Sequence, residues 1–290
     1  MTTLTSTSVA FEHILVPTDF SEASERALGY AKSVARRYQS DLFLIHVNQP
    51  INPVSPPEAT WIDMQPIQVQ LGEQMEQAGM ALRSEGFRAK ALSVPGTVQE
   101  EILSSIIANK IDLVVMGTHG KRGLDRLILG SETEDVQQRV NCPILVIGPA
   151  VPASGKDAWH PRRVICATTL DPTTAAIPAY AYLLAQQHQA DFLLVHLQDL
   201  NKPEMKTDWS AFEEAMAQHL PSGIKANRIT RTLFSDSLPG HQIVEVAKER
   251  HADLIVMGAR IGSAVATHFI RGTSAQVYAE AHCPVLVMHS

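Results

Sequence analysis

The chain has 290 residues, 45% of them hydrophobic and 19% charged, a composition typical of a globular protein long enough for two domains. Its 24 basic and 30 acidic residues give a formal net charge of -6, and the absence of a basic run argues against a nucleic-acid partner. The amino terminus has no leader-like pattern, and no stretch approaches the roughly 20 apolar residues that span a bilayer. We therefore expect a soluble, cytoplasmic protein without a membrane partner.

In the first half of the chain, short apolar runs alternate with helical patterns. Apolar residues recur at helical spacing over 23–38 and 98–107, and Thr97 with Glu100 predicts a capping box for the second helix. Continuous runs rich in Val, Ile and Leu are typical of strands buried on both faces. These predicted strands are Ile14–Pro17, Leu42–Val47, Ala89–Val94, Leu113–Met116 and Ile144–Ile147.

Two irregular stretches interrupt this alternation. The proline-rich insertion "NQPINPVSPPEATWIDMQP" (48–66) follows the second strand, and we expect it to overhang the end of the sheet as a lid or a partner surface. The stretch "MGTHGKRGLDRLILGSET" (116–133) leaves the fourth strand and leads into a helix that Gly130-Ser131 would open, with Ser131 and Glu134 as its capping box. Glycines beside a helix amino terminus are typical of a phosphate cradle, but they also serve as loop punctuation.

The second half repeats the first. "DLVVMGTHG" returns as "DLIVMGARIG", "NCPILVIG" as "HCPVLVMH", "HILVPTDFS" as "RVICATTLD" and "DLFLIHV" as "DFLLVHL". We therefore predict a first domain over 1–150, a linker over 151–162 and a second domain over 163–290, called half one and half two below. Strand-helix alternation with right-handed crossovers predicts a five-stranded, parallel, doubly wound α/β sheet in each half.

Details of the second half and the cysteines complete this outline. Asp171 and Pro172 predict the cap and first residue of a helix, and Pro178 predicts a kink or an early break within it. The three cysteines form no C-x-x-C pair, so we expect reduced, buried thiols and no metal site. The final strands of the two halves are apolar edges, and we expect them to pair about a pseudo-two-fold axis.

In open α/β sheets, ligands bind beyond the carboxyl ends of the strands. The spacing Gly117-x2-Gly120-x9-Gly130-Ser131-x-Thr133, with "VPTDFSEASERAL" and "CPILVIG", resembles the nucleotide motif of ATP-binding universal stress proteins, in their tandem, E-type form. This resemblance implies a Rossmann-like, adenine nucleotide α-hydrolase-like fold. It also implies ATP, with Mg²⁺, as the ligand.

The resemblance assigns roles residue by residue. Pro17 and Thr18 would form the wall of the base pocket, Asp19 would accept hydrogen bonds from adenine or ribose, and Val47 would read the adenine edge through its backbone. The ribose and phosphates would be lined by Met116, Gly117, His119, Gly120, Gly130, Ser131, Glu132 and Thr133.

Simpler interpretations stay open at several of these positions. Asp19 is also suited to capping the following helix, and the acids after Ser131 favour a helix dipole without any ligand and would repel a triphosphate. His46 and His196 end matching strands and are expected to pack or form hydrogen bonds rather than bind a ligand. His119 has no evident catalytic partner.

Half two departs from the motif. Its loop from Gly258 to Gly262 is one residue longer, Thr169 stands in place of Asp19, and Ala275 replaces the second hydroxyl after Gly272-Thr273. We expect half two to bind ATP weakly or not at all.

The sequence shows no phosphotransferase, hydrolase or metalloprotease signature, so enzymatic activity is uncertain and at most a slow ATP hydrolysis. We expect a nucleotide-loaded regulatory or protective module of the stress response, with an unknown protein partner and a homodimer left open. The alternatives are an adenylate-forming or phosphate-transferring enzyme, and a structural dimer with no nucleotide.

Overall fold

The computed structural model describes residues 8–49, 65–118, 140, 142–153, 159–168, 170–196, 209–220, 239–259 and 267–289. Its strands form a single sheet in the order β3-β2-β1-β4-β5-β9-β8-β6-β7. The strands of half one are β1 (His13–Pro17), β2 (Asp41–Asn48), β3 (Ala89–Pro95), β4 (Leu113–Gly117) and β5 (Ile144–Ile147). Those of half two are β6 (Arg163–Thr168), β7 (Asp191–His196), β8 (Leu254–Ala259) and β9 (Val285–His289).

All pairings within a half are parallel, so the predicted α/β class and the five strands of half one are confirmed. The counterpart of β3 in half two would fall within 221–238, which lies outside the described residues.

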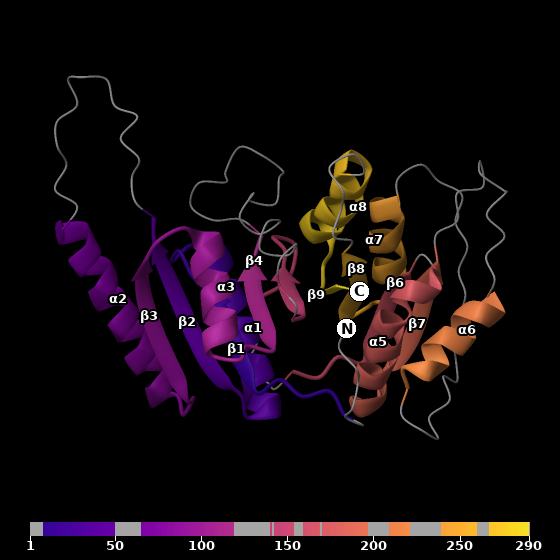
Figure 1. Cartoon of the computed structure of the whole chain (residues 1–290), viewed down its shortest axis with the longest axis horizontal. Coiled ribbons are helices and arrows are strands. Elements are labelled where there is room, and N and C mark those ends of the chain that lie inside the picture. The colour runs from indigo at the N-terminus through magenta and orange to yellow at the C-terminus, as the bar shows by residue number, and fades with distance from the viewer. Residues whose placement is uncertain are drawn as a thin grey trace.

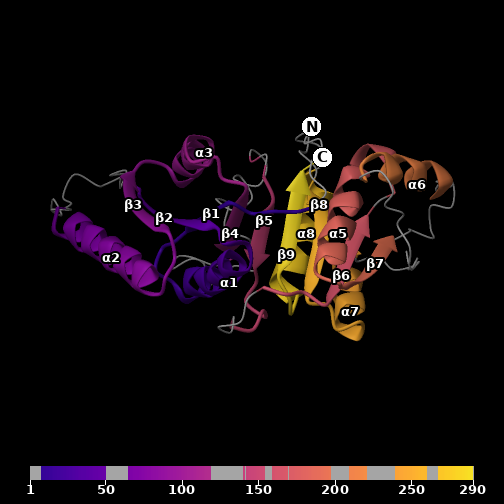
Figure 2. The same cartoon turned by 90° about the horizontal axis from the view of Figure 1, so that it is seen from below.

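Helices cover both faces of this sheet. In half one they are α1 (Glu22–Tyr38), α2 (Gln65–Ser84) and α3 (Val98–Ala108); in half two they are α5 (Ala176–Gln187), α6 (Trp209–Gln218), α7 (Pro239–Glu249) and α8 (Thr267–Glu280), preceded by the 3₁₀ turn η1 (Pro172–Thr174). Figure 2 shows α1 and α2 on one side of the half-one strands and α3 on the other. One apolar cluster joins α1 and α2 to α5 and α6, and a second joins α3 to α7 and α8. Each core layer therefore runs through both halves.

The two halves meet at β5 and β9, which lie side by side in the middle of Figure 2, and Figure 1 shows β1–β4 on one side of β9 and β6–β8 on the other. These strands are antiparallel, with Ile144 opposite Val287, Leu145 opposite Leu286 and Val146 opposite Val285. Since Val285 and Val287 are the repeat counterparts of Ile144 and Val146, the register is symmetric about the Leu145–Leu286 pair. The predicted pseudo-two-fold pairing through the final strands is confirmed.

The repeat is also visible in the hydrogen bonds that begin each half. Asp112 accepts from the backbone N–H groups of Glu12 and His13 at 2.7 and 3.1 Å. Asp253 accepts from those of Arg162 and Arg163, both at 2.9 Å. In both halves, the aspartate before one strand therefore holds the start of the neighbouring strand.

A second contact between the halves lies where α1 and α5 end. Tyr38 and His188 occupy matching positions of the repeat, each just before a residue with positive φ, Gln39 or Gln189. The Tyr38 hydroxyl lies 2.8 Å from His188 Nε2, and His188 Nδ1 lies 3.4 Å from Nδ1 of His160. His188 is only 1% exposed, so this polar contact is enclosed between the halves.

The predicted linker packs on half one. Trp159 is buried, its backbone N–H donates to the Ser33 carbonyl of α1 at 3.0 Å, and its ring contacts Tyr30 edge-on at 6.5 Å. The Tyr30 hydroxyl donates to the Pro152 carbonyl at 3.1 Å. Residues 154–158 of this segment are outside the described part of the chain.

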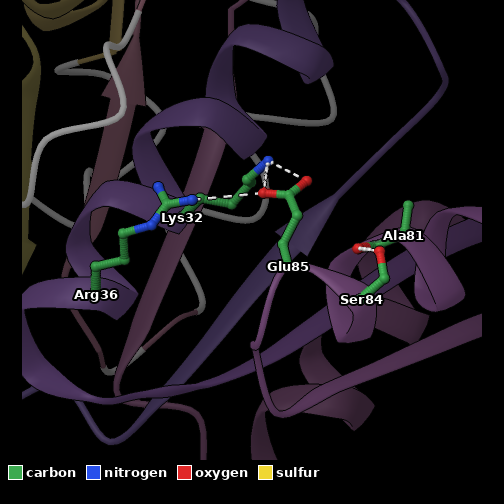
Figure 3. Close-up of polar contacts among 5 residues, drawn as sticks. All are labelled: Lys32, Arg36, Ala81, Ser84 and Glu85. Carbon is green, nitrogen blue, oxygen red and sulfur yellow. Dashed lines mark hydrogen bonds and ion pairs between the residues drawn. The ribbon is translucent and has the colours of Figure 1, made fainter.

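Helix α2 is not among the helices predicted above. Ion pairs connect the residue that follows its end to α1. Lys32 and Arg36 share the Glu85 carboxylate, at 2.6 and 3.4 Å, while Ser84 donates to the Ala81 carbonyl (Figure 3). The Arg36 guanidinium also lies 4.8 Å above the Phe87 ring. Partly exposed ion pairs contribute little to stability. The position of α2 therefore depends mainly on the packing of its buried residues, such as Met75 and Leu82. Of the insertion 48–66, predicted to be a lid or partner surface, residues 50–64 lie outside the described residues, while Asn48 ends β2 and Gln65 begins α2.

Three local predictions have different outcomes. The capping box predicted for α3 is wrong: Thr97 is the N-cap, but its side chain accepts no hydrogen bond from a backbone N–H. Its hydroxyl donates to the Glu100 carboxylate at 2.8 Å, so the two side chains bind each other directly through a charge-assisted hydrogen bond. Asp171 caps η1 as predicted, accepting from Thr173 N–H. The helical stretch then divides at Ala175, and Pro178 lies in the first turn of α5, where its missing N–H is not needed.

The cysteines are free thiols, with Cys166 and Cys283 buried and Cys142 half-buried. None of the helices in the described ranges is long and apolar enough to cross a membrane.

We predict that His188 makes stability depend on pH. Burial first, then Arg37 and His160, lowers its pKa from 6.5 to about 4. Below about pH 6.5 the unfolded chain takes up a proton at this ring while the folded protein does not, so acid favours unfolding. The free energy of unfolding should fall as the pH drops from 6.5 to 4, by up to about 3 kcal/mol at about 1.4 kcal/mol per unit.

Urea unfolding at a series of pH values measures this effect. His188→Gln keeps an acceptor for Tyr38 but takes up no proton, so it should flatten the pH dependence. His251→Asn, at an exposed histidine with positive φ, is the matched control and should leave it unchanged. An unaltered slope in His188→Gln would contradict the assignment.

Candidate functional site

The turn after β1 is held by a dense set of hydrogen bonds. Thr18 N–H donates to the Ile45 carbonyl at 2.8 Å, and Thr18 Oγ1 accepts from Phe20 N–H at 3.1 Å and donates to Ser24 Oγ. Asp19 Oδ1 accepts from Ser21 N–H at 3.0 Å. The N-cap of α1 is Ser21, which accepts from Ser24 N–H, so the alternative that Asp19 caps this helix is wrong. Asp19 instead stabilises the turn that leads into the helix.

His46 closes this turn from the neighbouring strand. Its Nδ1 lies 2.7 Å from the Thr18 carbonyl oxygen, and its ring packs on Phe20 with centroids 5.2 Å apart. A carbonyl oxygen only accepts, so Nδ1 carries the proton. Phe20 has φ of 58°, a left-handed conformation that costs about 1 kcal/mol or more for a residue other than glycine. The surrounding hydrogen bonds hold the chain in that conformation.

Half two has the same turn. His196 Nδ1 lies 3.0 Å from the Thr168 carbonyl, Thr168 Oγ1 accepts from Leu170 N–H at 3.1 Å, and Leu170 has φ of 59°. Asp171 occupies the capping position of Ser21. Thr169, the counterpart of Asp19, lies outside the described residues. The prediction that His46 and His196 form hydrogen bonds is confirmed, and the turn belongs to the repeat itself.

Val47 lies at the open end of β2. The pairing of β1 with β2 ends at Pro17 opposite Ile45, and Thr18 N–H reaches the Ile45 carbonyl. Because alternate residues of a strand point their backbone groups to the same side, those of Val47 point where those of Ile45 do, toward β1 but beyond its last paired residue. The backbone N–H and C=O groups of Val47 therefore point toward the side of the sheet where the Thr18–Ser21 turn follows β1.

Asn48 is a residue that the sequence pattern did not single out. Its Nδ2 donates to Ser93 Oγ at 2.9 Å, and its carbonyl accepts from Gly96 N–H. Its Oδ1 is buried and has no hydrogen-bond partner among the residues that the structure describes. A buried acceptor without a donor is uncommon and gives the end of β2 an unused hydrogen-bonding group. The only available signal was its place directly after a predicted strand.

On the other side of β1, β4 ends at Met116 and Gly117. Met116 is buried, and a Cβ atom at Gly117 would lie 2.6 Å from the Ala23 carbonyl oxygen of α1. Gly117 is therefore required by the close approach of α1 to β4, a reason distinct from the predicted approach of a phosphate. Thr118 N–H continues the pairing to the Ile147 carbonyl at 3.3 Å.

The structure thus brings together five predicted site residues, Pro17, Thr18, Asp19, Val47 and Gly117, with Met116 buried beside them. The remaining ones lie outside the described residues: His119, Gly120, Gly130, Ser131, Glu132 and Thr133. Within the described ranges, no group of His, Cys, Asp and Glu side chains could hold a metal ion.

In half two, the Gly-Thr pair of the repeat lies within the described residues. Helix α8 begins at Thr267, so Gly272 and Thr273 lie in its interior instead of opening it. The unpaired N–H groups of a helix belong to its first four residues, and those of Thr273 and its neighbours are engaged within the helix. A Cβ atom at Gly240 would lie 2.8 Å from the Thr273 carbonyl, which shows how closely α7 and α8 pack. The Gly-Thr pair of half two therefore offers no helix amino terminus.

A repeated α/β unit in one mostly parallel sheet defines the class of protein. A family model described as "Universal stress protein family" matches residues 10–148 and again 161–289. The chain therefore belongs to the universal stress protein family, with two such units in tandem.

Some relatives match the whole tandem chain and others match a single unit. Universal stress protein Rv2623 of Mycobacterium tuberculosis is 28% identical over 298 residues, covering 94% of this chain and 95% of that protein. Universal stress protein MJ0577 of Methanocaldococcus jannaschii is 30% identical over 162 residues, covering 48% of this chain and 96% of that protein. The crystal structure of a universal stress protein from Archaeoglobus fulgidus superposes with a TM-score of 0.72 at 20% identity, over 98% of each chain.

The packing role of Gly117 predicts opposite effects of one substitution at two glycines. Gly117→Ala should destabilise the protein by about 1–3 kcal/mol, because the new methyl group meets backbone atoms of Ala23 that cannot move aside. Gly72→Ala in α2, where a Cβ meets nothing within 4 Å, should stabilise by up to about 1 kcal/mol through helix propensity. Thermal unfolding of both variants measures this, and equal effects would contradict the packing role.

Proposed function

We propose that this universal stress protein binds one adenine nucleotide, ATP with Mg²⁺, at the carboxyl edge of half one. The observation that carries the proposal is the hydrogen-bonded Thr18–Ser21 turn, which contains Asp19 and follows β1 at the point where the backbone of Val47 extends beyond the last β1–β2 pair. A carboxylate accepts hydrogen bonds from hydroxyl or amino groups, and a free backbone N–H and C=O pair suits the edge of a base. The Gly117-to-Thr133 motif supports phosphate binding next to it.

Each predicted residue has a role in this proposal. Pro17 and Thr18 form the wall of the base pocket, Val47 pairs with the adenine edge, and Asp19 accepts from the ribose hydroxyls. Met116 and Gly117 form the floor at the end of β4. The phosphates lie on the glycine motif, whose members His119, Gly120, Gly130, Ser131, Glu132 and Thr133 follow β4 in the sequence.

Half two serves as the scaffold. Its Gly272-Thr273 pair lies within α8, and Asp171 is used as the cap of η1. The N–H groups of this pair and the Asp171 carboxylate are therefore already engaged in the fold of half two, although a phosphate or a ribose would need such groups. We infer that the linker over 151–162 and the β5–β9 pairing hold this second domain against the nucleotide-binding one. The protein then acts as a nucleotide-loaded regulatory or protective module in the stress response.

The final strands also bear on the homodimer left open by the sequence. Because β5 and β9 pair with each other, the apolar edges of both halves are already covered. A homodimer of this chain in the cytoplasm would therefore use another surface.

We predict that Asp19→Asn weakens ATP binding by about tenfold or more. The amide still accepts from Ser21 N–H and keeps the turn, but it loses the charged acceptor, and a hydrogen bond to a charged group contributes about 1.5–3 kcal/mol. Isothermal titration calorimetry with Mg-ATP measures the affinity.

The matched control is Asp171→Asn, which keeps the cap of η1 and makes the same change in half two. It should bind ATP as the wild type does. If Asp19→Asn bound ATP with unchanged affinity, or both variants lost affinity equally, the placement of the nucleotide at Asp19 would be wrong.

A further inference from the structure

The His46 ring belongs to the second strand of half one, packs on Phe20, and makes its hydrogen bond to one peptide group of the turn. That group joins the Thr18 carbonyl, which accepts the His46 hydrogen bond, to the N–H of Asp19. Since a peptide group is planar, fixing its carbonyl also fixes the direction in which the chain enters Asp19. The backbone direction from which the Asp19 side chain projects is therefore held by the His46 donor.

We propose that His46 is the positioning residue of the nucleotide site: through the Thr18 carbonyl it holds Asp19 in the binding orientation without contacting the nucleotide. This inference rests on the function proposed above and adds to it the residue that keeps the site in shape. It extends the view of His46 as a packing side chain, since a hydrogen bond of 2.7 Å is directed at the peptide of the ligand-facing acid.

Other contacts show that the turn needs such a clamp. Phe20, directly after Asp19, has φ of 58° and packs its ring on His46. A left-handed residue relaxes toward ordinary conformations when its neighbours release it. Thr18 Oγ1 holds Phe20 N–H, and Ile45 holds Thr18 N–H, so His46 completes the set of bonds around one peptide.

Half two supplies an internal control. His196 makes the same bond to the Thr168 carbonyl, at 3.0 Å, and Leu170 shows the same positive φ. Both histidines thus stabilise equivalent turns, but only the turn of half one carries an aspartate at the position of Asp19. A purely structural role predicts equal losses of stability for the two histidines and no loss of nucleotide affinity, whereas a positioning role adds a loss of nucleotide affinity for His46 alone.

The test compares His46→Leu, His46→Asn and His196→Leu. The leucine side chains remove the donor, and the asparagine amide restores an N–H close to the position of Nδ1. Titration with Mg-ATP should show affinity reduced about five- to tenfold in His46→Leu, largely recovered in His46→Asn, and unchanged in His196→Leu. Both leucine variants should lower the melting temperature by similar amounts.

Amide hydrogen exchange of the ligand-free protein provides the second readout. In His46→Leu, the peptide containing Phe20 and Ser21 should exchange faster than in the wild type, and His46→Asn should restore its protection. In His196→Leu, the faster exchange should appear at Leu170 instead. These amides are the donors that the two turns protect.

Several outcomes would overturn the proposal. Unchanged affinity in His46→Leu, an equal loss in His196→Leu, or a loss of affinity without faster exchange at Phe20 and Ser21 would each contradict positioning by His46. If the wild type binds no adenine nucleotide, the proposed function is wrong. The exchange experiment then decides alone whether His46 holds the turn.

Discussion

The antiparallel pairing of β5 with β9 is the constraint on which the rest of the structure depends. It joins two parallel sheets into one, and each of the two apolar clusters that cover this sheet contains residues of both halves. It also sets the halves in opposite directions, so the carboxyl edge of half one lies on the same side of the sheet as the amino edge of half two. Ligand sites at the two carboxyl edges would therefore be separate. The Tyr38–His188 contact places matching positions of the repeat against each other at this junction.

Comparison of the two halves distinguishes residues that serve the fold, which occur in both halves, from residues that a ligand would require. The aspartates before β4 and β8, the histidines at the ends of β2 and β7, and the left-handed residues after β1 and β6 occur in both halves, so they serve the scaffold. Asp19 and a Gly-Ser pair at the start of a helix are expected of half one alone. In half two, α8 extends past the glycine that would have opened it. The contrast supports a single nucleotide site on a duplicated frame.

Local sequence predicted the elements well where local interactions determine them. Four strands of half one, β1, β2, β4 and β5, are short apolar runs with buried centres, whereas the edge strand β3 is only partly buried. The bounds of all five agree with the predicted ones within a residue or two. The pairing of the final strands followed from their apolar character.

The role of Gly117 was harder to predict, because its close neighbour Ala23 is distant in sequence and a glycine pattern does not reveal which backbone approaches it. The start of α8 could not be read either: packing against α7 keeps Gly272 inside a helix despite its propensity of about 1 kcal/mol against helix. The partner of His46 depends on a turn geometry that only the fold defines.

Native mass spectrometry of the intact wild-type protein in the presence of Mg-ATP tests the central claim most directly, because it counts nucleotides per chain without disturbing the fold. The account predicts saturation at one nucleotide per chain. Saturation at two nucleotides per chain would show that half two is also a nucleotide site, and no retained nucleotide would show that the turn at Asp19 does not serve this ligand.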